Sequence, residues 1–150
     1  MNPNFKFSEA WASGERDNPD FDGDGVDGGI ISGFLVPQGI EAEANSSKIT
    51  VFVGEGDSSI TGDSFQVNSV KLNNSVSTNV DNVWDWKSQP LPSSGGDIDT
   101  FYVNYPVIHA GDTSAQINLP TGSDGFTLIF IIISFRSDAI TGGAITYLIR

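Results

Sequence analysis

The chain has 150 residues, the size of one domain, and carries 19 acidic against 7 basic side chains, for a net charge of −12. This balance argues against nucleic acid and anionic membrane surfaces as partners, because both are bound through clustered lysine and arginine, and it suits a protein that binds divalent cations. Cysteine is absent, which excludes disulfides and the common structural zinc sites.

The N-terminal segment, residues 1–14, is interpreted as an arm. Phe5–Phe7 predicts a short strand, and its rings together with Trp11 make the segment apolar. The arm could pack on its own domain or on a neighbouring subunit, and the sequence leaves both alternatives open. The first residues lack the basic start and apolar run of a signal peptide, so we expect a mature form if the protein is exported.

The acidic loop that follows is the most informative segment, because five aspartates fall within eleven residues. The spacing Asp20-x-Asp22-x-Asp24-Gly25 puts carboxylates at alternate positions of a glycine-bent loop, which suits the oxygen coordination of Ca²⁺. An EF-hand is excluded, because its twelfth loop position would be Ile31 instead of glutamate. The sequence therefore predicts a calcium site, and the alternative is an exposed acidic turn without metal. The predicted metal ligands are Asp17, Asp20, Asp22, Asp24 and Asp27.

From about Asp17 to Gly28, this loop resembles the thrombospondin type-3 repeats and the aspartate-rich linkers of bacterial surface proteins. The resemblance implies bound calcium and an extracellular setting. Asp27 is slightly out of step with the spacing of those repeats, so its role as a ligand is left open.

Strand signals recur along the rest of the chain, bounded by clusters of glycine, asparagine, aspartate and serine. Alternation is clearest in Lys48–Val53 and in Ala115–Leu119, and it marks antiparallel strands with one face in the core. In the first of these, Ile49, Val51 and Val53 share the apolar face. The predicted strands are Gly29–Val36, Lys48–Val53, Gln66–Leu72, Ile98–Val103, Ala115–Leu119, Phe126–Arg136 and Ala144–Ile149.

Residues 73–97 are expected to form a long loop, of a length that is usually functional or partly disordered. The loop contains Trp84 and Trp86, which are candidates for a carbohydrate-stacking platform with Asp81 and Asp85 beside them. The alternative is that one tryptophan caps the end of the fold while the other is partly exposed.

Asp97 and Asp99 form a second candidate metal site, because residues two apart on an extended strand point to the same side. Glu55, Asp57 and Asp63 lie on further acidic turns. Each acidic pair alone is also explained as a solvated polar turn, but with a net charge of −12 we expect at least one to bind metal.

No catalytic constellation is expected, and the protein is interpreted as a non-enzyme. His109 is the single histidine, and it is predicted to be a polar loop residue with no nucleophile beside it. The carboxylates could in principle cleave a glycoside, but they are expected on turns that lack the buried surroundings needed to raise a pKa.

Phe126–Arg136 is apolar on both faces, which predicts a central strand covered on both sides or one whose outer face meets another chain. The C-terminal strand, residues 144–150, follows a Gly142-Gly143 hinge and could pair within the domain or add to a neighbour's sheet edge. The longest apolar run is about half of what a membrane-spanning helix needs, so no membrane insertion is expected.

Seven or eight short strands without helices predict an all-β fold: one domain, residues 1–150, built as a two-sheet antiparallel sandwich of jelly-roll or immunoglobulin-like type. The succession Asn82-Val-Trp-Asp-Trp, Gly96-Asp-Ile-Asp-Thr-Phe-Tyr-Val and Ile133-Ser-Phe-Arg-Ser, within about Lys48–Asp138, resembles a β-sandwich domain of large secreted bacterial and archaeal surface proteins. In overall style the chain is also similar to the jelly-roll subunits of calcium-assembled archaeal tubes, the cannulae. These resemblances imply a structural or adhesive role outside the cell.

Composition and resemblance together lead to two functional expectations. The first is a structural subunit of an extracellular filament, tube or surface lattice, stabilised by Ca²⁺ and assembling with copies of itself partly by β-strand addition. The second is a calcium-dependent adhesion module that binds surface carbohydrate or a receptor through Trp84 and Trp86.

Overall fold

The computed structural model describes residues 28–39, 44–54, 58–88, 96–121, 126–136 and 144–149. Within these ranges all regular structure is strand, and no helix is present that could cross a membrane. The strands are β1 (Gly28–Ser32), β2 (Ser47–Gly54), β3 (Gln66–Val67), β4 (Val70–Lys71), β5 (Gly96–Tyr102), β6 (Ser114–Asn118), β7 (Thr127–Arg136) and β8 (Ala144–Ile149).

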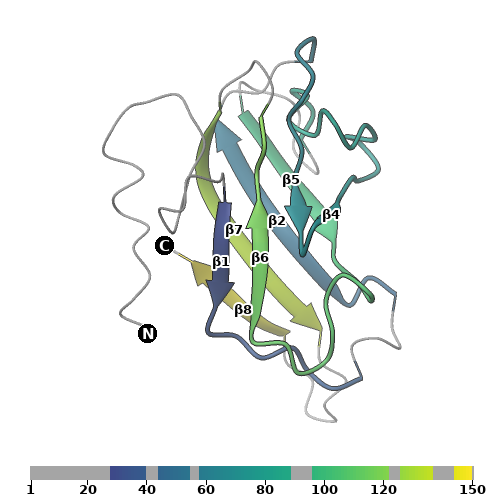
Figure 1. Ribbon diagram of the computed structural model, residues 1–150, viewed down its shortest axis with the longest axis vertical. Helices are drawn as coiled ribbons and strands as arrows, with labels where there is room; N and C mark the ends of the chain where they lie inside the picture. The colour runs from purple at the N-terminus through teal and green to yellow at the C-terminus, as the bar shows by residue number, and fades with distance from the viewer. Residues whose placement is uncertain are drawn as a thin grey trace.

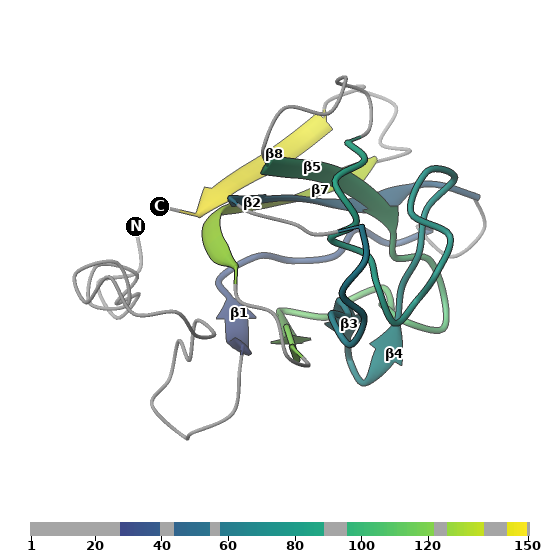
Figure 2. The same ribbon diagram turned by 90° about the horizontal axis from the view of Figure 1, so that it is seen from above.

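The strands form two antiparallel sheets that pack face to face (Figures 1 and 2). Sheet A has the order β1-β6-β3-β4, and sheet B has the order β5-β2-β7-β8. The chain crosses between the sheets at every connection except the hairpins β3–β4 and β7–β8. The predicted all-β two-sheet sandwich is confirmed. Its strand order differs from that of an immunoglobulin domain, in which the first two strands are neighbours in one sheet.

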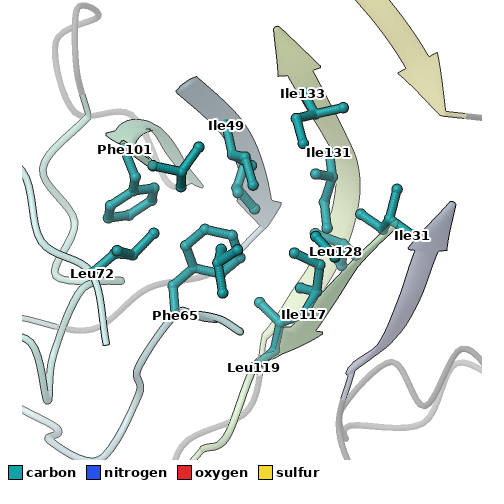
Figure 3. Packing of buried hydrophobic residues seen from close by; sticks show 14 of the residues in the cluster. Ile31, Ile49, Phe65, Leu72, Phe101, Ile117, Leu119, Leu128, Ile131 and Ile133 are labelled. Carbon is teal, nitrogen blue, oxygen red and sulfur yellow. The ribbon is translucent and has the colours of Figure 1, made fainter. Parts of the chain in front are cut away.

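The core lies between the sheets and is built from the inward-facing residues of alternating strands. On β2, Ile49, Val51 and Val53 are all fully buried, as their alternation predicted. Figure 3 shows Ile131 of β7 packed together with Ile117 of β6 in the space between the two sheets. Periodicity of two along each strand therefore accounts for the main packing of the molecule.

Strand β7 is central in sheet B, as predicted, and contains a β-bulge. Phe52 pairs with Phe130, but the next residue, Val53, pairs with Leu128, so Ile129 has no partner on β2. A bulge shifts the side-chain alternation by one residue. As a result, Ile129 and Phe130 are both turned toward the outer face of sheet B, between residues that are buried on the inner face.

Three expectations about strands meet different outcomes. The range Gln66–Leu72, predicted as one strand, is instead the hairpin β3–β4, because Asn68 and Ser69 adopt left-handed φ values of 48° and 67°. The C-terminal strand β8 pairs with β7 of the same chain. The predicted strand Phe5–Phe7 lies outside the described residues, as does the rest of the N-terminal arm.

Candidate metal centre

Strand β5 turns two aspartates into the interior of the sandwich. Its side chains alternate so that Asp97, Asp99 and Phe101 face inward, and all three are completely buried. Opposite them on β2 the partners of the two aspartates are Val53 and Val51, which are also fully buried. The prediction that Asp97 and Asp99 share one side of a strand is confirmed. The expectation that the carboxylates lack buried surroundings is wrong for these two.

The segment 73–88, here named the cap segment, bonds to both carboxylates. The Asn74 side chain donates from Nδ2 to Asp99 Oδ1 over 2.7 Å, and the Trp86 main-chain N–H donates to Asp97 Oδ2 over 3.0 Å. Trp86 has a φ of 67°, which is unusual for a bulky side chain. These bonds hold the cap segment against the inner face of β5.

The amide of Asn74 is itself fixed by the cap segment. Its Oδ1 accepts hydrogen bonds from the main-chain N–H groups of Val76, at 2.8 Å, and Ser77, at 2.7 Å. This arrangement is an Asx turn, and it orients Nδ2 toward Asp99. The donor to Asp99 is therefore set by local backbone geometry.

A third buried aspartate, Asp85, lies in the cap segment and is fully partnered. Its Oδ1 accepts from Ser77 Oγ at 2.9 Å and from the Lys87 main-chain N–H at 3.3 Å, and its Oδ2 is paired with Lys87 Nζ. The Lys87 side chain is 56% exposed, whereas that of Asp85 is 7% exposed. Lys87 thus neutralises Asp85 from the surface and is not buried among the other two carboxylates.

Asp97 and Asp99 each keep one oxygen without a partner. Asp97 Oδ1 and Asp99 Oδ2 are buried and have no hydrogen-bond partner among the residues that the structure describes. Burial raises the pKa of the Asp99 carboxyl to about 7, opposed by the Asn74 hydrogen bond and reinforced by the charges of Asp97 and Asp85. Burial also raises the pKa of Asp97, against the lowering effect of the Trp86 N–H. A buried carboxylate of this kind must be protonated, paired or bound to a metal ion.

For the other predicted metal ligands the structure gives no placement. Asp17, Asp20, Asp22, Asp24 and Asp27 lie outside the described residues. In the part of the chain that the structure describes, no three histidine, cysteine, aspartate or glutamate side chains converge into a complete metal-binding group. The centre therefore consists of two carboxylates with free oxygens, and not of a full set of protein ligands.

The two tryptophans do not form an exposed pair. Trp84 is completely buried, with its ring centroid 6.0 Å from those of Phe65 and Phe101 and 5.7 Å from that of Phe126. Trp86 is 45% exposed. Trp84 is thus a core residue, and the stacking platform considered from the sequence lacks its second ring.

Sequence reasoning missed the partners that the cap segment supplies. Asn74 and Ser77 lie in an Asn-Asn-Ser-Val-Ser stretch that is consistent with any polar turn. The Trp86 donor is a main-chain group, which has no residue signature at all. The spacing Asp97-x-Asp99 was the only signal in the sequence for this centre.

Comparison with protein-family models, with curated proteins and with solved structures found no match to the chain.

Proposed function

We propose that the chain is a structural subunit of an extracellular filament, tube or surface lattice that is stabilised by Ca²⁺. Copies would associate through the outer face of sheet B and in part by β-strand addition. The observation that carries this proposal is that a row of apolar side chains lies on the outer face of sheet B, whose described outward positions hold no acidic residue, although the chain as a whole has a net charge of −12.

An apolar row crosses the outer face of sheet B. Phe52 of β2 is paired with Ile98 of β5 on one side and with Phe130 of β7 on the other, and the two phenylalanine rings are 5.5 Å apart in an edge-to-face arrangement. The bulge adds Ile129, which is 36% exposed, to this apolar face. Ile132, which lies two residues after Phe130 on β7 and pairs with Thr50 of β2, extends it. Apolar residues clustered in this way are typical of an interaction surface.

The charges of sheet B favour another copy of the same chain as the partner. The only acidic residues in its four strands are Asp97 and Asp99, which face inward, while Lys48 and Arg136 lie on exposed positions of β2 and β7. Two strongly acidic chains repel one another least where acidic side chains are missing. The two cations would also attract acidic surfaces of a neighbouring copy.

Strand addition is best supported at β8, the outermost strand on one side of sheet B. The opposite edge, β5, is partly blocked by the cap segment: Ser88 Oγ donates to the Gly96 carbonyl over 3.1 Å and accepts from the Ile98 N–H over 3.0 Å. Covering an edge in this way prevents pairing with another chain. The adhesion-module alternative has less support, because only one of its two proposed tryptophans is exposed.

The test is the state of association of the purified protein in CaCl₂ and in chelator, followed by light scattering and electron microscopy over a range of concentrations. We expect Ile129→Asp to weaken association at least about tenfold, because it places a charge in the apolar face at a position that is already solvent-accessible. Leu35→Asp is the matched control: Leu35 is 59% exposed in the loop after β1 and outside sheet B, so this variant should associate normally. Monodisperse monomers of the wild type at high calcium and high protein concentration would refute the proposal.

A further inference from the structure

We infer that Asp97 and Asp99 together bind one Ca²⁺ ion between the inner face of β5 and the cap segment. This inference deepens the calcium part of the proposed function and rests on it, but it does not depend on self-association. The observation that carries it is a pair of buried carboxylate oxygens, Asp97 Oδ1 and Asp99 Oδ2, for which the described part of the chain supplies no hydrogen-bond partner.

The two carboxylates are oriented so that one oxygen of each is held by the protein and the other is free. Trp86 N–H holds Asp97 Oδ2, and Asn74 Nδ2 holds Asp99 Oδ1. Residues two apart on a strand lie about 6.6–6.8 Å from each other on one face. An ion bound about 2.3–2.6 Å from one oxygen of each carboxylate fits between two side chains at that separation.

No side-chain cation among the described residues is paired with these two oxygens. Lys87 Nζ is paired with Asp85, and its side chain reaches Asp85 from a largely exposed position. Two ionised carboxylates side by side in the interior repel one another and lose their hydration, so leaving both without a counter-ion is costly. One divalent ion removes both penalties at once.

The ligand chemistry selects Ca²⁺ over the other common divalent ions. The donors are carboxylate oxygens, which are hard ligands, and the single histidine of the chain, His109, is an exposed residue of a separate loop. Mg²⁺ demands nearly octahedral geometry and retains several waters, which a buried pair of carboxylates accommodates poorly. Ca²⁺ accepts irregular coordination, so two aspartates can be completed by main-chain carbonyl oxygens and by water.

Binding at this position would link the cap segment to the sheet. Both aspartates belong to β5, but each is oriented by a hydrogen bond from the cap segment, from Asn74 or from Trp86. An ion that fixes the two carboxylates therefore also favours the docked position of the cap segment. In the metal-free protein, repulsion between the aspartates acts against that position.

The test is thermal unfolding and calorimetric titration of dilute protein with CaCl₂ as the sole ligand. At a calcium concentration about 100 times Kd, we expect the wild-type Tm to rise by about 5–10 °C relative to the metal-free protein. We expect Asp97→Asn and Asp99→Asn each to weaken calcium binding at least tenfold and to lose most of the Tm rise. The same two variants should be at least as stable as the wild type without calcium, since each removes one of the two repelling charges.

Two controls separate this site from the acidic loop and from a loss of folding. The double variant Asp22→Asn/Asp24→Asn should retain the calorimetric site that Asp97→Asn and Asp99→Asn remove. Asp85→Asn should keep calcium binding within a few-fold of wild type, because both oxygens of Asp85 are already partnered. A calcium response that is unchanged in Asp97→Asn and Asp99→Asn overturns the inference, whether or not the protein assembles. A response that survives in both variants but disappears in the loop variant overturns it too, while leaving calcium in the proposed function.

Discussion

The protonation of Asp99 is linked to the stability of the fold. It is completely buried on β5, one oxygen bonds to Asn74, and the other is unpartnered. Its carboxyl has a pKa raised from 3.8 to about 7, mainly by burial and further by the charges of Asp97 and Asp85. In the metal-free protein a proton at Asp99 would relieve the same repulsion that a bound ion would relieve.

This raised pKa predicts a pH dependence of stability with a definite sign. Between about pH 4 and about pH 7 the folded state binds a proton at Asp99 that the unfolded chain has released, so the free energy of unfolding should fall as the pH rises. The stabilisation is complete at the low end of this range and is lost by its upper end. We expect metal-free wild type to lose a few kcal/mol relative to Asp99→Asn across the range, as measured by denaturant unfolding. If the free energy of unfolding changes with pH in the same way for wild type and Asp99→Asn, the raised pKa of Asp99 is contradicted.

The hairpin β3–β4 depends on a short turn formed by Asn68 and Ser69. Asn68 and Ser69 both have positive φ, which is the type I′ arrangement of tight hairpins. Asn68 also ties the turn to its surroundings: Nδ2 donates to the Val107 carbonyl over 2.7 Å, and Oδ1 accepts from the Gln116 N–H over 3.0 Å. The two turn residues therefore have different roles, since the structure gives side-chain bonds across the molecule for Asn68 alone of the two.

Glycine substitution at these two positions should have opposite effects on stability. Ser69→Gly should stabilise the protein by about 0.5–1 kcal/mol, because glycine adopts positive φ without the steric cost that serine incurs. Asn68→Gly has the same conformational advantage but loses both side-chain hydrogen bonds, so it should destabilise by about 1–2 kcal/mol. Equal Tm shifts of the same sign for the two variants would show that the side-chain bonds of Asn68 contribute little.

The elements that could be predicted from sequence are those in which local alternation and tertiary burial agree. Lys48–Val53 is the clearest case, because every second residue is apolar and the same residues face the core. The hairpin was missed because Gln66–Leu72 has strand-forming residues on both sides of Asn68-Ser69, and this pair lacks the glycine that usually marks a two-residue hairpin turn. The bulge at Ile129 was missed because Phe126–Arg136 is apolar on both faces. In such a strand apolar and polar residues do not alternate, so the sequence does not show where an extra residue shifts the alternation.

The candidate centre was predictable only in part. The spacing of Asp97 and Asp99 fixed their common side, since alternation in a strand depends on nothing distant. Their burial depends on the cap segment, whose contacts come from the Asx turn at Asn74 and from the main-chain N–H of Trp86. Neither contact has a distinctive sequence pattern, so the same aspartates were equally consistent with a solvated turn.

At the scale of the whole molecule, charge is distributed unevenly. The chain has a net charge of −12, yet the outward-facing residues of β2, β5 and β7 include two cations and no acid. Repulsion between copies therefore acts between whole molecules, whereas the proposed attraction acts locally, at the outer face of sheet B and at its edge strand β8. These two contributions respond differently to salt, because ions screen long-range repulsion between exposed charges and leave apolar contacts intact.

Association in the absence of calcium should consequently strengthen with ionic strength. Raising NaCl from about 0.02 M to about 0.5 M shortens the screening length several-fold, so the repulsion between acidic copies should fall while burial of Phe52, Phe130 and Ile129 is unaffected. We expect sedimentation of the metal-free wild type to give a larger associated fraction at the higher salt, and Ile129→Asp to give none at either. If added salt instead dissociates the protein, the contact is held by exposed ion pairs that involve the cations of this face, Lys48 and Arg136, and the apolar row is not the interface.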